Sequence, residues 1–424
     1  MKFIYKLLSL SLAIACLSGC SAANTEIASS SAATATVTPT TDSTEVPASN
    51  NVFTSAGDGL YVTTDSGIYE LQTVFPDSAN IFYTDANTKE RIFLCANPNC
   101  THADESCPSY IATPSAMFPP MLLRVGDQLL VVFTEATDSS NPHGMLMNMD
   151  GSNRRTVFEL ASNQYMQGGF CTSGNDLYFD LYEINDSGNV TYQLWYVSFE
   201  NGTSEKVMDL GSDSDHYSLC DGANNELCFN HVSSDGISYC MYNPQSKTIS
   251  DPFFVDSSVS GNSMIQDGYL FVLDEQASSV QRIRLSDKEQ ASASFTVKEG
   301  FGAPSMRYLF DGNLMITEAQ TTASDIPTDG SYGACSYILD FGTRNCTEFT
   351  LQTPYNNRPV YVLTTIGDAC YVATDYKTYT PTSVSEDGTV SNFDYVANIY
   401  AFITKQDYIN SNQNGYSMVK DAFE

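Results

Sequence analysis

The chain has 424 residues, of which 50 are acidic and 19 basic, so its formal net charge at pH 7 is −31. A surface this acidic repels phosphate backbones, which argues against nucleic acid as a partner. Beyond the first twenty residues, no stretch approaches the roughly 20 consecutive apolar residues that a transmembrane helix needs. We therefore expect an acidic folded body that does not itself span a membrane.

The amino terminus has the pattern of an export signal. Lys2 and Lys6 precede an apolar stretch over residues 7–17, which is too short to remain as a bilayer span. The stretch ends in Leu17-Ser18-Gly19-Cys20, which resembles a bacterial lipobox, and the alternative is an ordinary signal peptide with an incidental cysteine. We expect residues 1–19 to be removed and Cys20 to carry a lipid at the outer face of the cytoplasmic membrane.

Residues 20–51 follow as a segment rich in Ser, Thr and Ala, with almost no large apolar side chains. Such a composition buries too little apolar surface to offset the entropy lost on ordering. We therefore predict a flexible spacer, and a coil of this length reaches on the order of 30 Å. It would lift the folded body, residues 52–424, clear of the lipid headgroups.

The body is dominated by short runs of aromatic and aliphatic residues between Gly, Asp, Asn and Ser clusters, a texture typical of strands and tight turns. A polar turn leads directly into an apolar strand at seven places, with reference positions Leu60, Leu129, Leu177, Leu227, Leu270, Leu314 and Cys370. Successive separations are 69, 48, 50, 43, 44 and 56 residues. A four-stranded propeller blade needs about 40–50 residues. The pattern predicts an all-β chain that forms a β-propeller, with seven blades favoured and six or eight as alternatives.

Two β-sandwiches are the competing architecture, because they also show strands at regular spacing. In the propeller interpretation, residues 398–419 supply outer strands of the last blade, and residues 52–62 close the ring.

The most specific chemical feature is a Cys/His loop at residues 94–108. It contains Cys95, Cys100, His102 and Cys107 in the pattern Cys-x4-Cys-x-His-x4-Cys. Three thiolates and one imidazole can complete a tetrahedral zinc site with no open position, so such a site would be structural. The spacing is not a C-x2-C zinc pattern, and an exported protein also meets oxidising conditions. A structural zinc site, a disulfide and free buried thiols therefore all stay open for this loop.

Two further cysteine pairs flank tight turns. Cys228 and Cys240 surround Ser233-Ser234-Asp235-Gly236, and Cys335 and Cys346 surround Asp340-Phe341-Gly342. A hairpin at each turn would bring its two cysteines toward each other, which favours local disulfides.

The lipobox, the spacer, the strand-rich body and the four residues of the Cys/His loop together resemble a group of uncharacterised lipoproteins of Gram-positive bacteria. The resemblance implies a propeller-like body, and it implies no particular reaction or ligand.

No catalytic pattern is found, and we assign no catalytic residue. The histidines are His102, His143, His216 and His231, and none lies in H-E-x-x-H; G-x-S-x-G and P-loop motifs are also absent from the sequence. We expect a surface-displayed binding or interaction module for a glycan, a peptide or a partner protein. The alternatives are an extracytoplasmic polysaccharide hydrolase or lyase and a scaffold subunit of a surface assembly.

Overall fold

The computed structural model describes residues 53–55, 59–75, 78–113, 119–256, 262–320, 334–379, 382–384, 390–392 and 395–422. The predicted signal peptide, Cys20 and the spacer lie outside these ranges. Strands dominate the described residues, and the prediction of an all-β chain is confirmed. The helical elements there are α1 (Lys405–Ile409) and the one-turn 3₁₀ helix η1 (Gln413–Gly415). No helix in the described ranges has the length and apolarity needed to cross a bilayer.

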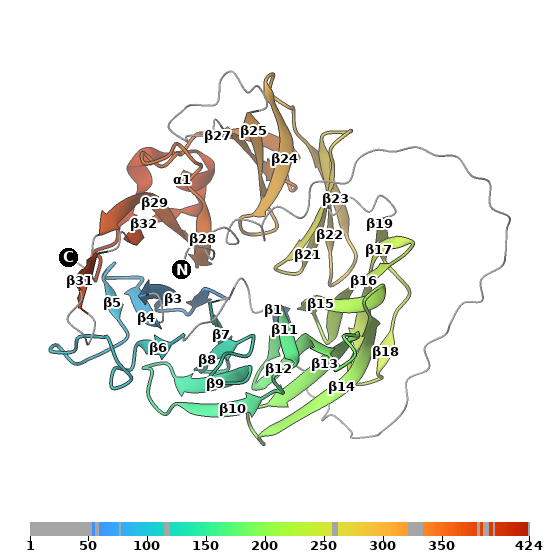
Figure 1. Ribbon diagram of the computed structural model, residues 1–424. Helices are drawn as coiled ribbons and strands as arrows, with labels where there is room; N and C mark the ends of the chain where they lie inside the picture. Colours follow the sequence, from blue (N-terminus) through green and yellow to red (C-terminus); the bar gives the residue numbers. More distant parts are fainter. Residues whose placement is uncertain are drawn as a thin grey trace, which may run out of the picture.

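Antiparallel sheets follow one another along the chain and stand side by side in a ring (Figure 1). The first sheet contains β2 (Tyr61–Thr63), β3 (Gly67–Phe75), β4 (Ser78–Asp85), β5 (Arg91–Phe93) and β6 (Tyr110–Ala112). The second sheet contains β7 (Met121–Val125), β8 (Gln128–Phe133), β9 (His143–Asn148) and β10 (Arg155–Glu159). Strands β2–β5 and β7–β10 each pair with their neighbours in the sequence, as in a meander, whereas β6 pairs with β4.

The third sheet in chain order has ten strands. They are β1 (Thr54–Ser55), β11 (Gln164–Ser173), β12 (Asp176–Ile184), β13 (Val190–Ser198), β14 (Thr203–Ser212), β15 (Asp215–Ala223), β16 (Glu226–Ser233), β17 (Gly236–Asn243), β18 (Thr248–Ile249) and β19 (Phe254–Asp256). The pairing of β14 with β15 consists of Gly211↔His216 and Ser212↔Asp215 alone. This sheet is therefore two meanders, β11–β14 and β15–β18, joined at one corner.

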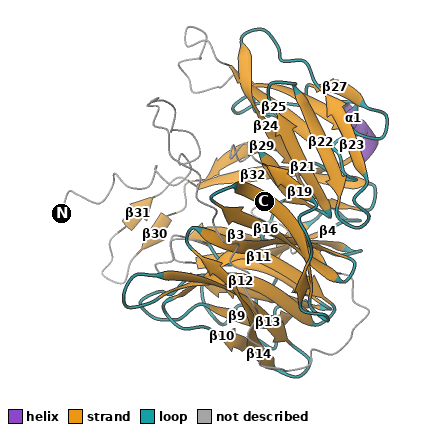
Figure 2. Ribbon diagram, turned by 90° about the vertical axis from the view of Figure 1, so that its right-hand side faces the viewer, coloured by secondary structure: helices purple, strands orange, loops and turns teal. Residues whose placement is uncertain are grey.

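Three sheets complete the ring. One contains β20 (Ser263–Gln266), β21 (Tyr269–Asp274), β22 (Ser279–Arg284) and β23 (Gln290–Ser294), and the next contains β24 (Phe301–Tyr308), β25 (Leu314–Gln320), β26 (Ala334–Asp340) and β27 (Asn345–Phe349). The last contains β28 (Val362–Ile366), β29 (Ala369–Tyr379), β32 (Tyr395–Thr404) and β33 (Ser417–Met418). A separate hairpin, β30 (Thr382–Val384) and β31 (Val390–Asn392), stands apart from the stacked sheets (Figure 2).

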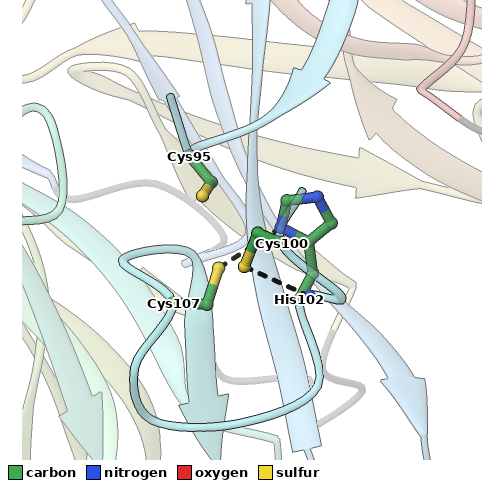
Figure 3. Close-up of side chains that lie close together, drawn as sticks. All are labelled: Cys95, Cys100, His102 and Cys107. Carbon is green, nitrogen blue, oxygen red and sulfur yellow. Dashed lines mark hydrogen bonds between the residues drawn. The ribbon is translucent and has the colours of Figure 1, made fainter. Parts of the chain in front are cut away.

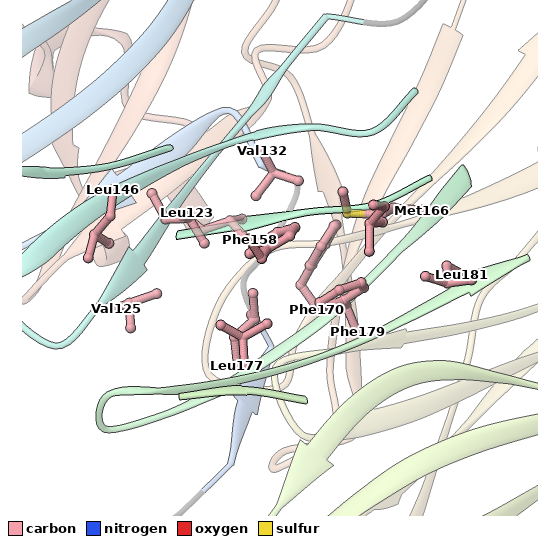
Figure 4. Close-up of a cluster of buried hydrophobic side chains, with 13 residues drawn as sticks. Leu123, Val125, Val132, Leu146, Phe158, Met166, Phe170, Leu177, Phe179 and Leu181 are labelled. Atoms are coloured by element: carbon pink, nitrogen blue, oxygen red, sulfur yellow. The ribbon is translucent and has the colours of Figure 1, made fainter. Parts of the chain in front are cut away.

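The sheets are buried on both faces because each packs between two others. Successive side chains of a strand point to opposite faces, so on β12 Leu177 and Phe179 join the core shared with the second sheet, while Tyr178 joins the core shared with β15–β18. Figure 4 shows the first of these cores, in which Leu123 of the second sheet lies near Leu177. Because alternate residues point to opposite faces, one strand thus contributes side chains to two hydrophobic cores.

The first and last sheets also pack against each other, and we call this contact the seam. Ile68 of β3 and Tyr371 of β29 are fully buried in one shared cluster. The Thr63 and Thr364 hydroxyls lie 2.8 Å apart across the seam. A parallel bridge between Glu90 and Lys420 adds two backbone hydrogen bonds of 2.9 Å. The ring is therefore closed by side chains and by main-chain hydrogen bonds.

Arg91 of β5 is the largest polar group at the seam, and its side chain is 1% exposed. Its guanidinium donates to Glu70 at 2.8 and 3.0 Å and to Asp421 at 3.0 Å. Tyr400 of the last sheet donates its hydroxyl proton to the other oxygen of Glu70. A buried ion-pair network thus links the two ends of the chain.

The two ends of the folded body are used in different ways. β32 and β33 are the outer strands of the last sheet, as expected. Of the described residues in 52–62, those of β1 do not lie at the seam: they pair with Cys171 and Thr172 of β11, and the Phe53 amide donates to the Asn224 carbonyl at 2.9 Å. Tyr61 does lie at the seam, where its ring packs on Tyr371. Phe53 packs against Gly222, and a Cβ added at residue 222 would lie only 2.5 Å from the Cβ of Phe53.

Six of the seven reference positions begin the second strand of a meander, but Leu60 does not. It precedes β2 and is 40% exposed. Ile68, at the start of β3 and fully buried, occupies the corresponding place. The sequence pattern places the start of the first repeat eight residues too early, because the turn Thr64-Asp65-Ser66 before Ile68 is less conspicuous in the sequence than Gly57-Asp58-Gly59 before Leu60.

Candidate metal centre

The Cys/His loop interrupts the outer edge of the first sheet. β5 and β6 both pair with β4, through Phe93↔Phe82 and Tyr110↔Asn80. Between these pairings, the Leu94 amide donates to the Ile81 carbonyl at 2.9 Å, and the Ile81 amide donates to the Ser109 carbonyl at 2.8 Å. The two ends of the loop are therefore held next to each other by a single strand, β4.

Within the loop the four predicted residues converge. The sulfur atoms of Cys95, Cys100 and Cys107 and a ring nitrogen of His102 all lie within 4.8 Å of one another (Figure 3). His102 Nδ1 is 3.3 Å from Cys107 Sγ, and the His102 amide donates to Cys100 Sγ at 3.4 Å. The structure thus brings together all four residues that the sequence singled out.

The local backbone explains how the loop turns inward. The Cys100 amide donates to the Asn97 carbonyl, and the Cys107 amide donates to the Asp104 carbonyl, so each cysteine ends a tight turn. His102 has a φ of 57°, a left-handed conformation that reverses the chain between its neighbours. Its ring stacks on Phe93, with centroids 4.0 Å apart and planes 7° apart, which fixes the imidazole.

Residues outside the loop hold it in place through hydrogen bonds to its main chain. Asn80 of β4, fully buried, donates through its Nδ2 to the His102 carbonyl and to the Ser109 hydroxyl, each at 3.0 Å. Arg154 reaches from the second sheet and donates to the Tyr110 carbonyl at 2.6 Å and to the Pro108 carbonyl. These supporting groups lie far from the loop in sequence, and no local pattern indicated them.

The thiols of the cluster are in unequal environments. Burial raises the pKa of Cys107, but hydrogen bonds from Ser109 and His102 outweigh it and lower the pKa to about 6. Burial raises the pKa of Cys95 to about 11. Cys107 is the most enclosed of the three, with 1% of its surface exposed.

The donor set fits a metal ion. Zinc–sulfur bonds of about 2.3 Å in a tetrahedron place neighbouring ligand atoms roughly 3.8 Å apart. The 4.8 Å limit on the separations in the loop is close to this value, and the three cysteines are free thiols. Small inward movements would therefore bring all four atoms into coordination distance.

The structure does not bring together the other two predicted cysteine pairs. Cys240 lies opposite Phe229, and Cys228 lies opposite Met241, so Cys228 and Cys240 project from opposite faces of the sheet. Cys346 lies opposite Leu339, four positions from Cys335. That offset is roughly 13 Å along a strand, whereas a disulfide needs Cα atoms within about 7 Å. All four cysteines are free thiols.

No protein-family model matches the chain, and no curated protein sequence matches it significantly. Among solved structures, the tricorn protease is similar over 81% of this chain at 10% identity and a TM-score of 0.31, and the match covers only 35% of that protein. Oligogalacturonate lyase from Vibrio parahaemolyticus is similar over 82% of this chain and 91% of its own, at 10% identity and a TM-score of 0.38. The β-propeller domain of the Trilobed protease from Pyrococcus furiosus is similar over 72% of this chain and 99% of its own, at 12% identity and a TM-score of 0.36. The last of these is named as a β-propeller domain, and nothing about the role of this chain follows from these likenesses.

Proposed function

We propose that this chain is an exported lipoprotein whose propeller acts as a binding module for a glycan, a peptide or a partner protein. In this proposal, Cys20 carries the lipid, and the Cys/His loop holds a structural zinc ion that stiffens one side of the ring. The observation that carries the zinc assignment is the convergence of four protein ligands, because a closed set leaves no position for substrate.

We infer that the ring has seven blades. Support comes from the sequence of four-stranded meanders, if β11–β14 and β15–β18 are counted as two units. The buried clusters give the same count, since each lies between consecutive units and one lies across the seam. This arrangement leaves only short sheet edges exposed, which is how propellers limit edge-to-edge association.

Elemental analysis tests the zinc ion directly. The purified chain should contain about one zinc per molecule, and Cys100→Ser should remove it, since three ligands do not close the site. Cys346→Ser, which changes an exposed cysteine outside the cluster, is the matched control and should keep the zinc. Protein without zinc, in which two of the three loop thiols resist alkylation until a reductant is added, would instead establish a disulfide there.

Fractionation tests the anchor. The unaltered chain should be recovered with membranes, whereas Cys20→Ala should be recovered as a folded protein in the soluble fraction. Retention of Cys20→Ala in the membrane fraction would rule out a tether at this residue.

A glycan array followed by product analysis tests the binding role. Binding without turnover would support a binding module, whereas cleavage of a bound glycan would replace it with the hydrolase or lyase. Failure to bind any glycan would direct the search to peptides and partner proteins.

A further inference from the structure

A cavity of about 450 Å³ opens at the seam, and it is lined by residues of the first, second and last sheets. Its walls include Asp65 of the β2–β3 turn, Lys89 of the β4–β5 turn and Arg124 of β7. Thr365 and Ile366 at the end of β28 and Phe402 of β32 also line it. The cavity is thus built from segments distant in sequence, and it is open to the outside.

The charge of this lining is opposite to that of the chain. Acidic residues outnumber basic ones by 50 to 19 overall, yet the lining has two basic side chains and one acidic side chain. Within a strongly anionic surface, this lining with one excess positive charge is a local place where an anion is favoured.

Lys89 is placed by its backbone and by an aromatic ring. It has a φ of 62°, and its ammonium lies 4.1 Å from the centroid of the Phe402 ring. The ammonium donates to the Ala86 carbonyl, which uses one of its three N–H donors. Its charge is therefore held at the wall of the cavity with donors left for a ligand.

Arg124 is oriented by main-chain oxygens. Its Nε donates to the Gly126 carbonyl at 2.9 Å, and Nη1 approaches the Thr63 carbonyl at 3.5 Å. Its carboxylate neighbour, Asp127, is 3.4 Å away and its side chain is fully exposed, so that pair neutralises little of the guanidinium charge. A planar guanidinium held in this way suits a ligand carboxylate.

The rest of the lining combines hydroxyls with a small apolar wall. Thr365 provides a hydroxyl group, and Ile366 and Ala369 provide apolar surface. The Thr63 hydroxyl is paired with Thr364, and the Thr64 hydroxyl donates to the Gly67 carbonyl at 2.9 Å, so both face the cavity already hydrogen-bonded within the protein. This mixture matches a compact molecule that has hydroxyl groups and an apolar C–H face in addition to its charge. We propose that the seam cavity binds an acidic sugar, with its carboxylate between Lys89 and Arg124.

This inference rests on the proposed role as a binding module and names its ligand class. Titration calorimetry of the full chain in detergent with glucuronate, with glucose as the neutral control, tests it. Glucuronate should bind and glucose should not. A disaccharide that ends in glucuronate shows whether the natural ligand is the end of a glycan chain or the free sugar acid. Tighter binding of the disaccharide than of glucuronate would identify the end of a glycan chain, and equal affinity would identify the free acid.

Three variants and a control locate the site. Lys89→Gln and Arg124→Gln should each weaken glucuronate binding at least tenfold, as estimated for a charged hydrogen bond, and Asp65→Asn should strengthen it. Lys247→Gln is the matched control, because Lys247 also has a left-handed backbone (φ 54°) but lies on an exposed turn of another sheet. It should leave binding unchanged.

Equal binding of glucose, no binding of glucuronate at millimolar concentration, or unchanged binding by Lys89→Gln would overturn the assignment of this cavity. A neutral glycan or peptide that binds the chain with an affinity insensitive to Lys89→Gln would overturn it while leaving the proposed binding module intact.

Discussion

Replacing Arg91 with methionine should destabilise the whole ring, because this side chain joins the first sheet to the carboxyl-terminal residues. Methionine keeps much of the length and apolar volume but removes the charge and the donors. The variant leaves the Glu70 carboxylate, in a residue only 4% exposed, with Tyr400 as a donor and without its guanidinium partner. Asp421, with a side chain 14% exposed, also loses its ion pair.

The expected magnitude follows from the buried charge. Removing one partner of a buried pair typically costs about 3–5 kcal/mol, because the remaining charge is left without compensation. Unfolding entropy of roughly 2.1 cal/mol/K per residue over about 370 residues gives about 0.8 kcal/mol/K. The loss of stability therefore corresponds to a melting midpoint lower by about 4–6 °C.

Thermal unfolding followed by circular dichroism at pH 7 measures this shift. Arg155→Met, which changes an exposed arginine on β10, is the matched control and should move the midpoint by less than about 1 °C. The double variant Glu70→Met/Arg91→Met removes both charges and should recover at least half of the loss, because no unpaired carboxylate remains at Glu70.

A midpoint for Arg91→Met within about 1 °C of the unaltered chain would refute the reasoning. It would mean that the Glu70 carboxylate is hydrated or protonated at little cost. The apolar contacts of the seam and the backbone bridge between Glu90 and Lys420 would then hold the ring closed without the ion pairs of Arg91.

Three further outcomes are expected. Gly169→Ala should lower the free energy of unfolding in urea by about 1–3 kcal/mol, because a Cβ there would lie 2.2 Å from the Leu219 carbonyl oxygen and 2.6 Å from Asp180 Oδ1. Gly342→Ala is the control: its Cβ would meet only a side-chain oxygen at 3.2 Å, so it should cost much less. Burial raises the pKa of Asp180 to about 7, whereas the carboxyl of the unfolded chain titrates near pH 4. The folded state therefore holds the proton between these two pH values, and the free energy of unfolding should fall by up to about 1.4 kcal/mol per pH unit as the pH rises from about 4 to 7. A pH profile for Asp180→Asn as steep as that of the unaltered chain would contradict this. Removing zinc with a chelator should speed hydrogen exchange at residues 94–109 and leave exchange in β21 unchanged; equal exchange with and without chelator would argue against a structural ion.

The strands were predictable because their signals are local. Leu177 and Leu314 each follow a polar turn and begin a run of buried residues, and both lie where the sequence places the start of a strand. The four residues of the Cys/His loop were predictable for the same reason, since they lie within thirteen positions. Turn chemistry and apolar alternation need no knowledge of distant segments.

Features that depend on register or on distant contacts were not predictable. Ser233 pairs with Gly236, and this two-residue turn sets Cys228 and Cys240 one position out of register, which is enough to place them on opposite faces. The partner of Arg91 at the carboxyl end, Asp421, is 330 residues away. Asn80 supports the Cys/His loop only because β4 passes beneath it, a consequence of the sheet and not of any motif.

The attachment of β1 determines how the ring would carry a mechanical load. A pull on the amino-terminal side of Phe53 is transmitted first to β11 and to the Asn224 carbonyl, where the chain enters the fold. These contacts lie at the junction of two meanders within the ten-stranded sheet, where hydrogen bonds continue from one meander into the next. The seam, which depends on side chains such as Arg91 and Thr63 and on the bridge between Glu90 and Lys420, lies elsewhere on the ring. Tension from a tether would therefore act first on hydrogen-bonded strands and would leave the closure of the ring unloaded.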